Sequence, residues 1–212
     1  MIITVGNTKG GVGKSTISMN LAVEASIAGH TVLIVDTDPQ GSVIDFRNER
    51  DTEDISVVSV ISNKLHKDIE KFKTSFDFII IDAGGRDNGV FRSAIVASDL
   101  FILPVLPSQL DVWAAQDAVD AFEEMQTFRD IKGRIVLNMV DERTKLKNDV
   151  LDAVSAYKES LPLLTTQLHN LTAFKHAVPE GKGVSEYDKN GKAAKEINAL
   201  FHEILDTVKG EI

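Results

Sequence analysis

The amino-acid sequence predicts an α/β fold in three layers, with a mostly parallel central sheet flanked by helices. Apolar runs of strand length alternate along the chain with segments of helical spacing, as expected for right-handed βαβ units. The runs at 31–35 and 78–81 are continuous and uncharged, as in strands that are buried on both faces. The length of 212 residues suits a single domain, which we expect to span residues 1–212.

Each expected element has a local signal in the sequence. Gly29 marks the stop of the first helix, and Leu65, Ile69 and Phe72 recur at helical spacing. Helices are expected at 15–28, 64–74, 110–128, 145–157 and 192–208. Strands are expected at 2–5, 31–35, 55–60, 76–81, 100–105 and 134–140, with a weaker last strand at 161–166.

Composition excludes several kinds of site. The chain has no cysteine, which excludes disulfides, iron–sulfur clusters and zinc–thiolate sites and fits a cytoplasmic location. No apolar run approaches the roughly 18 residues that span a bilayer. The N-terminus lacks the basic region of a signal peptide and is expected to form the first strand. The formal net charge of −9 disfavours binding to DNA or anionic lipid, except through a local basic patch.

A glycine-rich loop, Lys9-Gly10-Gly11-Val12-Gly13-Lys14-Ser15-Thr16, joins the first expected strand to the first expected helix. Backbone N–H groups of such a turn, with the helix N-terminus, form a cradle for phosphate oxygens. Glycine suits the turn because the backbone visits positive φ and lies against the ligand. We expect ATP with Mg²⁺ here: Lys14 on the β- and γ-phosphates, Ser15 on Mg²⁺ and Thr16 near the α-phosphate.

Two features separate this loop from the usual pattern G-x-x-x-x-G-K-[ST]. Thr8 stands where that pattern has its first glycine, and an additional lysine, Lys9, opens the Lys-Gly-Gly core. Lysine is usually a solvated surface residue. Beside a triphosphate, however, Lys9 is better explained as a second cation, able to reach a nucleotide held by a second subunit.

Three aspartates follow two of the buried runs. Asp36 and Asp38 come after 31–35, and Asp82 comes after 78–81. Ligands of open α/β sheets bind at this carboxyl edge, where a carboxylate can orient an attacking water or hold Mg²⁺ through water. A single aspartate there would more often be a cap or turn residue. Three of them beside a phosphate loop favour a functional site, with Asp82 as the Walker B residue.

These segments resemble the deviant-Walker ATPases of the ParA/MinD group. The resemblance is carried by the glycine-rich loop, by Val-Asp-Thr-Asp-Pro-Gln-Gly-Ser at 35–42 and by Phe-Asp-Phe-Ile-Ile-Ile-Asp at 76–82. The stretches 92–100 and 104–115 are similar to small ParA partition proteins in particular. The resemblance extends from Ile2 to about Phe201 and implies a P-loop NTPase fold of the short form, without the helix-turn-helix extension of larger ParA proteins.

The resemblance also implies a mechanism. ATP binding is expected to drive a face-to-face homodimer that binds DNA non-specifically and associates with the nucleoid. A centromere-binding, ParB-type partner is expected to stimulate an otherwise slow hydrolysis, so that repeated cycles segregate or position plasmid or chromosomal DNA.

The same resemblance assigns roles to individual residues. Lys9 and Lys14 are expected to be catalytic cations, and Asp38 matches the aspartate that orients the hydrolytic water. Asp36 and Asp82 match the positions associated with Mg²⁺, together with Ser15. Asn138 and the segment 179–188, which begins at Pro179, match the positions that cradle adenine.

Two positions depart from the family pattern. Residues 83–86 read Ala-Gly-Gly-Arg where many relatives have a Pro-Pro pair, in a switch-like loop next to the γ-phosphate. There Arg86 is as well explained by contact with phosphate or a partner as by solvation. Asn170 stands where many small relatives have an arginine, which weakens any residue-specific assignment of DNA contacts.

Two basic clusters are candidates for sequence-independent contact with DNA phosphates: Arg143, Lys145 and Lys147, and Lys189, Lys192 and Lys195. On composition alone such a cluster is more often a solvated face. The last helix has an apolar stripe but few basic residues, which favours packing on the sheet over binding to a membrane surface.

Two other functions compete with DNA partition. The same switch is able to position a protein cargo, such as a chemotaxis array or a microcompartment. A metabolic synthetase on the same scaffold would need polar anchors beside the γ-phosphate, and the sequence identifies none. An iron–sulfur reductase is excluded because the chain has no cysteine.

Overall fold

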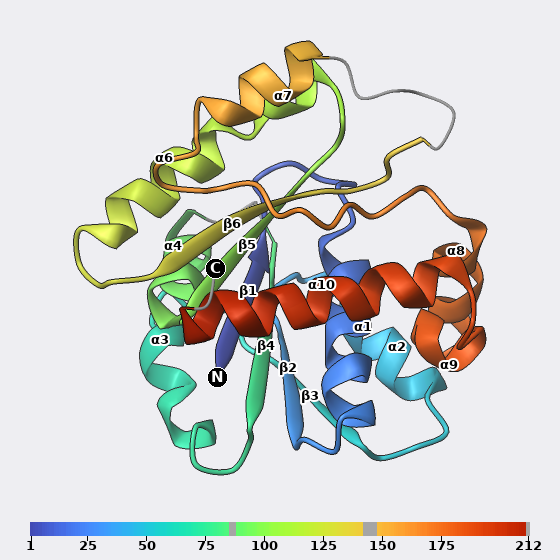
Figure 1. The fold of residues 1–212 in the computed structure, drawn as a ribbon. Helices are drawn as coiled ribbons and strands as arrows, with labels where there is room; N and C mark the ends of the chain where they lie inside the picture. The colour runs from blue at the N-terminus through green and yellow to red at the C-terminus, as the bar shows by residue number, and fades with distance from the viewer. Residues whose placement is uncertain (85–87, 142–147, 211–212) are drawn as a thin grey trace.

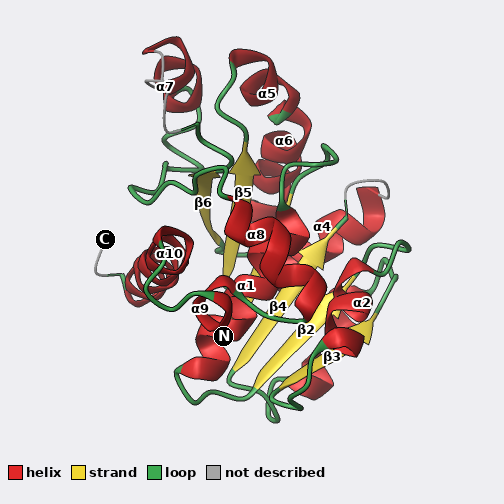
Figure 2. Ribbon diagram, turned by 90° about the vertical axis from the view of Figure 1, so that its right-hand side faces the viewer, coloured by secondary structure: helices red, strands yellow, loops and turns green. Residues whose placement is uncertain are grey.

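The computed structural model describes residues 1–84, 88–141 and 148–210. Its centre is a six-stranded sheet in which every neighbouring pair of strands is parallel (Figures 1 and 2). The strand order is β3-β2-β4-β1-β5-β6. The strands are β1 Ile2–Gly6, β2 Val32–Asp36, β3 Ile55–Ser59, β4 Phe78–Ala83, β5 Leu100–Val105 and β6 Lys132–Leu137.

Helices cover both faces of the sheet, which confirms the predicted three-layer α/β fold. The described helices are α1 Lys14–Ile27, α2 Ser42–Glu49, α3 Leu65–Asp68, α4 Asn88–Ala97, α5 Gln109–Ala114, α6 Gln116–Gln126, α7 Asn148–Ser155, α8 Thr172–Ala177, α9 Val184–Tyr187 and α10 Lys192–Lys209. Helices α1, α2 and α10 pack on one face, and α3, α4 and α6 pack on the other. None of the helices in these ranges is long and apolar enough to cross a membrane.

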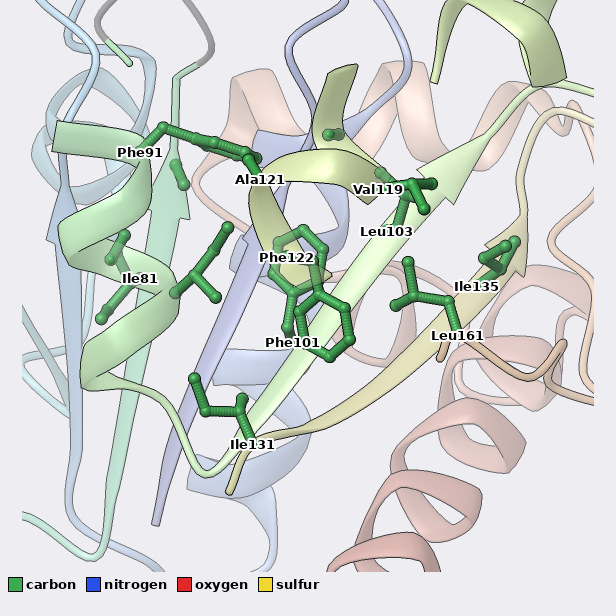
Figure 3. Close-up of a cluster of buried hydrophobic side chains, with 14 of the residues drawn as sticks. Ile81, Phe91, Phe101, Leu103, Val119, Ala121, Phe122, Ile131, Ile135 and Leu161 are labelled. Carbon is green, nitrogen blue, oxygen red and sulfur yellow. The ribbon is translucent and has the colours of Figure 1, made fainter. Parts of the chain in front are cut away.

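The strands divide their side chains between two apolar clusters. In β1, Ile2 points to the cluster under α4 and α6, whereas Ile3 points to the cluster under α1 and α10. Phe101 of β5 and Phe122 of α6 stack with ring centroids 5.3 Å apart at the centre of the first cluster (Figure 3). The stripe of α10 is buried in the second cluster, so this helix packs on the sheet as expected.

Three predicted elements were wrong. The helix predicted over 64–74 is divided into α3, which ends at Asp68, and a 3-10 helix over Glu70–Phe72. Residues 161–166 do not form a strand: the segment makes an isolated bridge between Leu163 and Ile135, and the N–H groups of Thr165 and Thr166 then donate to the Glu203 carboxylate instead of to β6. The helix predicted over 110–128 is divided at Ala115 into α5 and α6. The two parts have different packing partners, since α5 lies against α7 and α6 lies against α4 (Figure 2).

Strand register brings the ends of three strands to one place. Asp36 at the end of β2 lies beside Asp82 of β4, and Asp82 lies beside Val5 of β1. The glycine-rich loop leaves β1 one residue later, at Gly6. The candidate phosphate loop and the candidate carboxylates are therefore neighbours at the carboxyl edge of the sheet.

Candidate functional site

The glycine-rich loop wraps around the N-terminus of α1. Gly11 and Gly13 have φ of 76° and 88°, in the left-handed region that favours glycine. Beside the loop is a cavity of about 470 Å³. It is lined by Thr8, Gly10, Gly11, Gly13, Lys14, Ser15, Thr16, Asp38, Gln40, Ser42 and Met139. The cavity thus combines backbone amides and a helix N-terminus, as a phosphate cradle requires.

Two asparagines brace the loop from below. Asn7 accepts a hydrogen bond from the Lys9 N–H at 2.9 Å and donates to the Pro104 carbonyl at 2.8 Å. Asn138, at the end of β6, donates its side-chain amide to the Val12 carbonyl at 2.8 Å. Both asparagines are buried. Sequence reasoning missed the role of Asn7, although a polar residue directly after a buried strand was a usable signal.

Asp82 lies beneath the loop and is 2% exposed. The Ser15 hydroxyl donates to its carboxylate at 2.6 Å, and the Ser18 hydroxyl donates at 3.1 Å. Burial raises the pKa of Asp82 to about 6, and the nearby Asp36 adds to the rise, against the opposing effect of both serines and Lys14. Ser15 and Asp82 together place a hydroxyl and a carboxylate oxygen side by side, the donor types that Mg²⁺ prefers.

Asp36 and Asp38 have different surroundings. Asp36 is 1% exposed, and its two oxygens accept the N–H groups of Asp38 at 2.9 Å and Val43 at 3.3 Å. Burial raises the pKa of Asp36 against these hydrogen bonds. Asp38 lines the phosphate cavity. Asp36 therefore shapes the loop after β2, whereas Asp38 is the carboxylate that faces the cavity.

Thr37 joins the ends of β2 and β4. Its N–H and hydroxyl both donate to the Asp82 carbonyl, at 3.2 and 3.0 Å, and the hydroxyl accepts the Gly84 N–H at 3.1 Å. A Cβ on Gly84 would lie 3.3 Å from the Asp38 carboxylate. The buried Thr37 hydroxyl thus sets the distance between the Asp38 loop and the chain that leaves β4.

The two lysines of the loop have different partners. Lys14 donates to the Lys9 carbonyl at 3.0 Å; burial lowers its pKa, against the opposing charges of Asp82 and Asp38. Lys9 forms an ion pair with Asp111 of α5. Burial opposes ionisation of Asp111, but the hydrogen bonds from Lys9 and Ser108 hold its pKa below the usual value. Lys9 therefore lies outside the lining of the phosphate cavity.

A second cavity, of about 310 Å³, adjoins the first. It is mainly apolar and is lined by Thr16, Ile17, Asn138, Met139, Leu168, His169, Asn170, Leu171, Phe174, Lys175, Val178 and Pro179. Thr16 and Met139 line both cavities. A ligand could therefore place a flat apolar group in the second cavity and phosphates on the loop, with its connecting part next to Thr16 and Met139. A nucleotide needs this arrangement.

The segment that covers this second cavity is anchored to α2. Arg50, just after α2, donates to the Gly181 carbonyl at 2.9 Å and to both oxygens of Glu186, at 2.8 and 2.7 Å. It also forms a two-pronged pair with Asp54. These charges keep the pKa of Arg50 above its ordinary value despite burial. The anchor holds Val178 and Pro179 over the cavity.

Comparison with known proteins agrees with this geometry. Residues 3–192 match the model of the CobQ/CobB/MinD/ParA nucleotide-binding domain. The chain belongs to this family. Several relatives match nearly end to end. The maintenance of carboxysome distribution protein A of Halothiobacillus neapolitanus is 28% identical, with 96% of this chain and 95% of the relative covered. The sporulation initiation inhibitor protein Soj of Bacillus subtilis is 27% identical, with 96% and 97% covered.

Solved structures share the fold. An apo McdA structure from Cyanothece has a TM-score of 0.77 and 17% identity, covering 96% of this chain and 98% of that one. Cobyrinic acid a,c-diamide synthase of Mycobacterium smegmatis, solved with ADP and magnesium, has a TM-score of 0.76 and 19% identity, covering 100% and 96%. The ParA/MinD resemblance and the P-loop fold expected from the sequence are thereby confirmed.

The structure brings most of the predicted site residues together. The loop residues and Asp38 line the first cavity, Asn138 and Pro179 line the second, and Asp36 and Asp82 lie beneath. Val12 is buried and contributes its carbonyl to Asn138. Asn170, noted as a departure from the family pattern, lines the second cavity.

The basic residues singled out in the sequence are only partly within the described ranges. Arg86, Arg143, Lys145 and Lys147 lie outside them. Lys189, Lys192 and Lys195 are exposed around the start of α10, where Lys192 pairs with Glu196 at 3.7 Å.

Proposed function

We propose that this chain is an ATPase that works as a nucleotide-dependent switch and segregates or positions DNA. The observation that carries the proposal is the cavity shared by Asp38, Lys14 and the loop glycines. A carboxylate able to orient a water thereby faces a phosphate cradle, and catalysis of phosphoryl transfer consists mainly of such positioning and of charge stabilisation.

In this proposal each group of the site has one task. Lys14 and the loop amides bind the β- and γ-phosphates of ATP, and Asp38 orients the attacking water. Ser15 holds Mg²⁺, with Asp82 and Asp36 beneath it; Mg²⁺ neutralises charge on the phosphates. Lys9 reaches the nucleotide of a second subunit, so that ATP stabilises a homodimer. Asn138 and Pro179 contact the adenine.

The test of the switch is the size of the protein in three states: with ATP, with ADP, and as Asp38→Ala with ATP. We expect a monomer with ADP and a trapped dimer for Asp38→Ala with ATP, because hydrolysis is removed while the cradle is kept. A monomer in all three states would contradict the switch.

The DNA step has a separate test. ATP-loaded protein should be retained on DNA of any sequence at low salt, with affinity that falls steeply as salt rises, because neutralised phosphates release counterions. We expect Lys189→Ala with Lys195→Ala, two exposed lysines near the start of α10, to weaken retention without changing dimerisation. Failure of the ATP-loaded wild-type protein to bind DNA at low salt would contradict the proposed DNA-binding step.

A second candidate is a switch of the same build that positions a protein cargo. It is favoured by the end-to-end similarity to a relative named for carboxysome distribution. Purification of tagged Asp38→Ala from cells separates the two: a small basic DNA-binding partner of ParB type supports DNA partition, whereas co-purification of an assembly protein supports cargo positioning. Both variants of the proposal place the protein in the cytoplasm, on the nucleoid when ATP is bound.

A metabolic synthetase is the weaker third candidate. Its support is a likeness of fold, at 19% identity, to a cobyrinic acid a,c-diamide synthase. ADP release that depends on a small carboxylic acid, in the absence of DNA or protein partners, would favour it over the switch.

A further inference from the structure

Met139 has an unusual backbone. Its φ is 56°, and it is the non-glycine residue with positive φ in the described part of the chain. The left-handed region is disfavoured for a residue with a Cβ, and among non-glycine residues it is visited mainly by asparagine, aspartate and histidine. Such a conformation persists only where the surrounding structure imposes it, and such residues cluster at functional sites.

Hydrogen bonds on both sides impose the conformation. Before Met139, the Asn138 N–H donates to the Val105 carbonyl at 2.9 Å, and its side chain donates to the Val12 carbonyl. After it, the Val140 N–H donates to the Leu168 carbonyl at 3.0 Å. Asn138 and Val140 are thus both held in place by hydrogen bonds, and the change in chain direction after β6 falls on residue 139.

The turn directs the Met139 side chain over the glycine-rich loop. A Cβ on Gly13 would lie 3.5 Å from the Met139 terminal methyl. Met139 lines both the phosphate cavity and the apolar cavity, a position that it shares with Thr16. The residue is nevertheless 38% exposed, so its side chain is only partly covered by protein.

We propose that Met139 is a nucleotide-contact residue, whose thioether covers the sugar and the base where they leave the phosphate cradle. Methionine suits this position because it is flexible, and its polarisable sulfur packs well on aromatic rings. The strained backbone persists because the hydrogen bonds of Asn138 and Val140 hold the chain on both sides of residue 139. The inference rests on the nucleotide site of the proposed function and requires neither the dimer nor DNA.

The experiment compares three variants, Met139→Ala, Met139→Gly and Met139→Leu, with wild-type protein. Calorimetric titration measures binding of Mg-ADP and of Mg-pyrophosphate, which has no sugar or base. Thermal unfolding without ligand measures the backbone cost. Alanine and glycine both remove the thioether that would cover the ligand, but only glycine relieves the left-handed backbone.

We expect alanine and glycine to weaken Mg-ADP binding about fivefold, because less apolar surface is buried on the sugar and base. Mg-pyrophosphate binding should change less than about twofold, since that ligand does not reach Met139. Leucine should restore most of the affinity for Mg-ADP. The glycine variant should unfold roughly 2–4 °C above the alanine variant, for about 1 kcal/mol of relieved strain in a chain of this size.

Three results would overturn the proposal. Unchanged Mg-ADP affinity in the alanine variant would show that the Met139 side chain does not contact the nucleotide. Equal weakening of Mg-ADP and Mg-pyrophosphate would mean that Met139 acts through the loop. Equal unfolding temperatures of the alanine and glycine variants would show that the backbone of residue 139 is not strained. If wild-type protein binds neither probe, the nucleotide site itself is refuted, and with it the proposed function.

Discussion

The three glycines of the phosphate loop meet different requirements. Gly10 has open space where a Cβ would stand, Gly11 has open space but a φ of 76°, and Gly13 combines a φ of 88° with the Asn138 amide 2.2 Å from a Cβ. Of these three positions, Gly13 is the one at which an added side chain would cause both overpacking and backbone strain. Glycine at this position is therefore required by the tertiary contact with β6 as well as by the turn.

Replacing these glycines by alanine should give a graded series. We expect Gly13→Ala to lose about 3 kcal/mol of stability and roughly 6–12 °C in Tm, and Gly11→Ala about 1 kcal/mol. Gly10→Ala should unfold at the wild-type temperature within about 1 °C. Thermal unfolding of the three variants without ligand checks this, and equal Tm values would contradict it.

The raised pKa of Asp82 makes stability depend on pH. The pKa is about 6 in the folded chain and 3.8 ordinarily. Below about pH 4 the Asp82 carboxyl is protonated in both the folded and the unfolded chain, and it does not lower the free energy of unfolding. Between about pH 4 and 6 only the unfolded chain loses the proton, so the free energy of unfolding falls as pH rises. Above pH 6 the cost is complete, at about 3 kcal/mol.

Asp82→Asn should remove this cost. In urea unfolding without Mg²⁺ or nucleotide, we expect the stability of Asp82→Asn relative to wild type to increase by up to about 3 kcal/mol between pH 4 and pH 7.5. The difference between the two proteins cancels other titrating groups. A difference that does not change with pH would mean that the Asp82 pKa is near its ordinary value.

Among the elements, the segment from α8 to α9 depends on one buried charge. The Arg50 side chain is 3% exposed and holds this segment to the end of α2 through Glu186 and the Gly181 carbonyl. Residue 50 is far from the segment in sequence, and the pairing is made by the fold. Removal of the arginine would leave the carboxylates of Asp54 and Glu186, whose side chains are 33% and 27% exposed, without their cation.

Arg50→Met should therefore destabilise the fold by about 3 kcal/mol and weaken Mg-ADP binding, because Val178 and Pro179 are no longer held over the second cavity. Arg50→Lys keeps the positive charge but cannot make the two-pronged hydrogen bonds of a guanidinium. Its stability and its ADP affinity should therefore lie between those of wild type and of Arg50→Met. Chemical unfolding and ADP titration check both effects. Wild-type ADP affinity in Arg50→Met would show that the anchor does not position the cavity wall.

At the scale of the whole molecule, the site is assembled from the first strand to the last third of the chain. Its residues come from the loop after β1 and the start of α1, from the ends of β2, β4 and β6, and from the segment around α8. A ligand that binds all of them is bound only by the folded chain. Nucleotide binding and global stability are therefore linked by mass action.

Mg-ADP at a hundred times its Kd should raise stability by about 2.7 kcal/mol, which corresponds to roughly 5–11 °C in Tm for a chain of this size. Lys14→Ala, which removes the cation of the cradle, should give a much smaller shift at the same concentration. A scan of Tm against Mg-ADP concentration checks this. The same shift in both proteins would show that the stabilisation does not arise in the phosphate cavity.

The sequence by itself determined the fold class, the phosphate loop and the carboxylates at the strand ends. These follow from local patterns: uncharged runs make buried strands, and a glycine-rich turn between strand and helix makes a cradle. The first helix was predicted to within a residue because the glycine-rich loop precedes it and Gly29 follows it, and the last helix because it carries a long apolar stripe. The short helices α2, α4, α8 and α9 were missed, since their stability comes from tertiary packing rather than from propensity.

Only the tertiary structure decided which residues work together across the chain. Asn7 and Asn138 brace the loop, Asp111 pairs with Lys9, and Met139 spans two cavities, through contacts between residues up to 126 positions apart. The same reason explains the false strand at 161–166: its apolar residues fit a strand, but the N–H groups of Thr165 and Thr166 donate to Glu203 of α10 and not to β6. Local sequence encodes backbone preference, whereas pairing, burial and side-chain direction arise only when the whole chain has closed around its sheet.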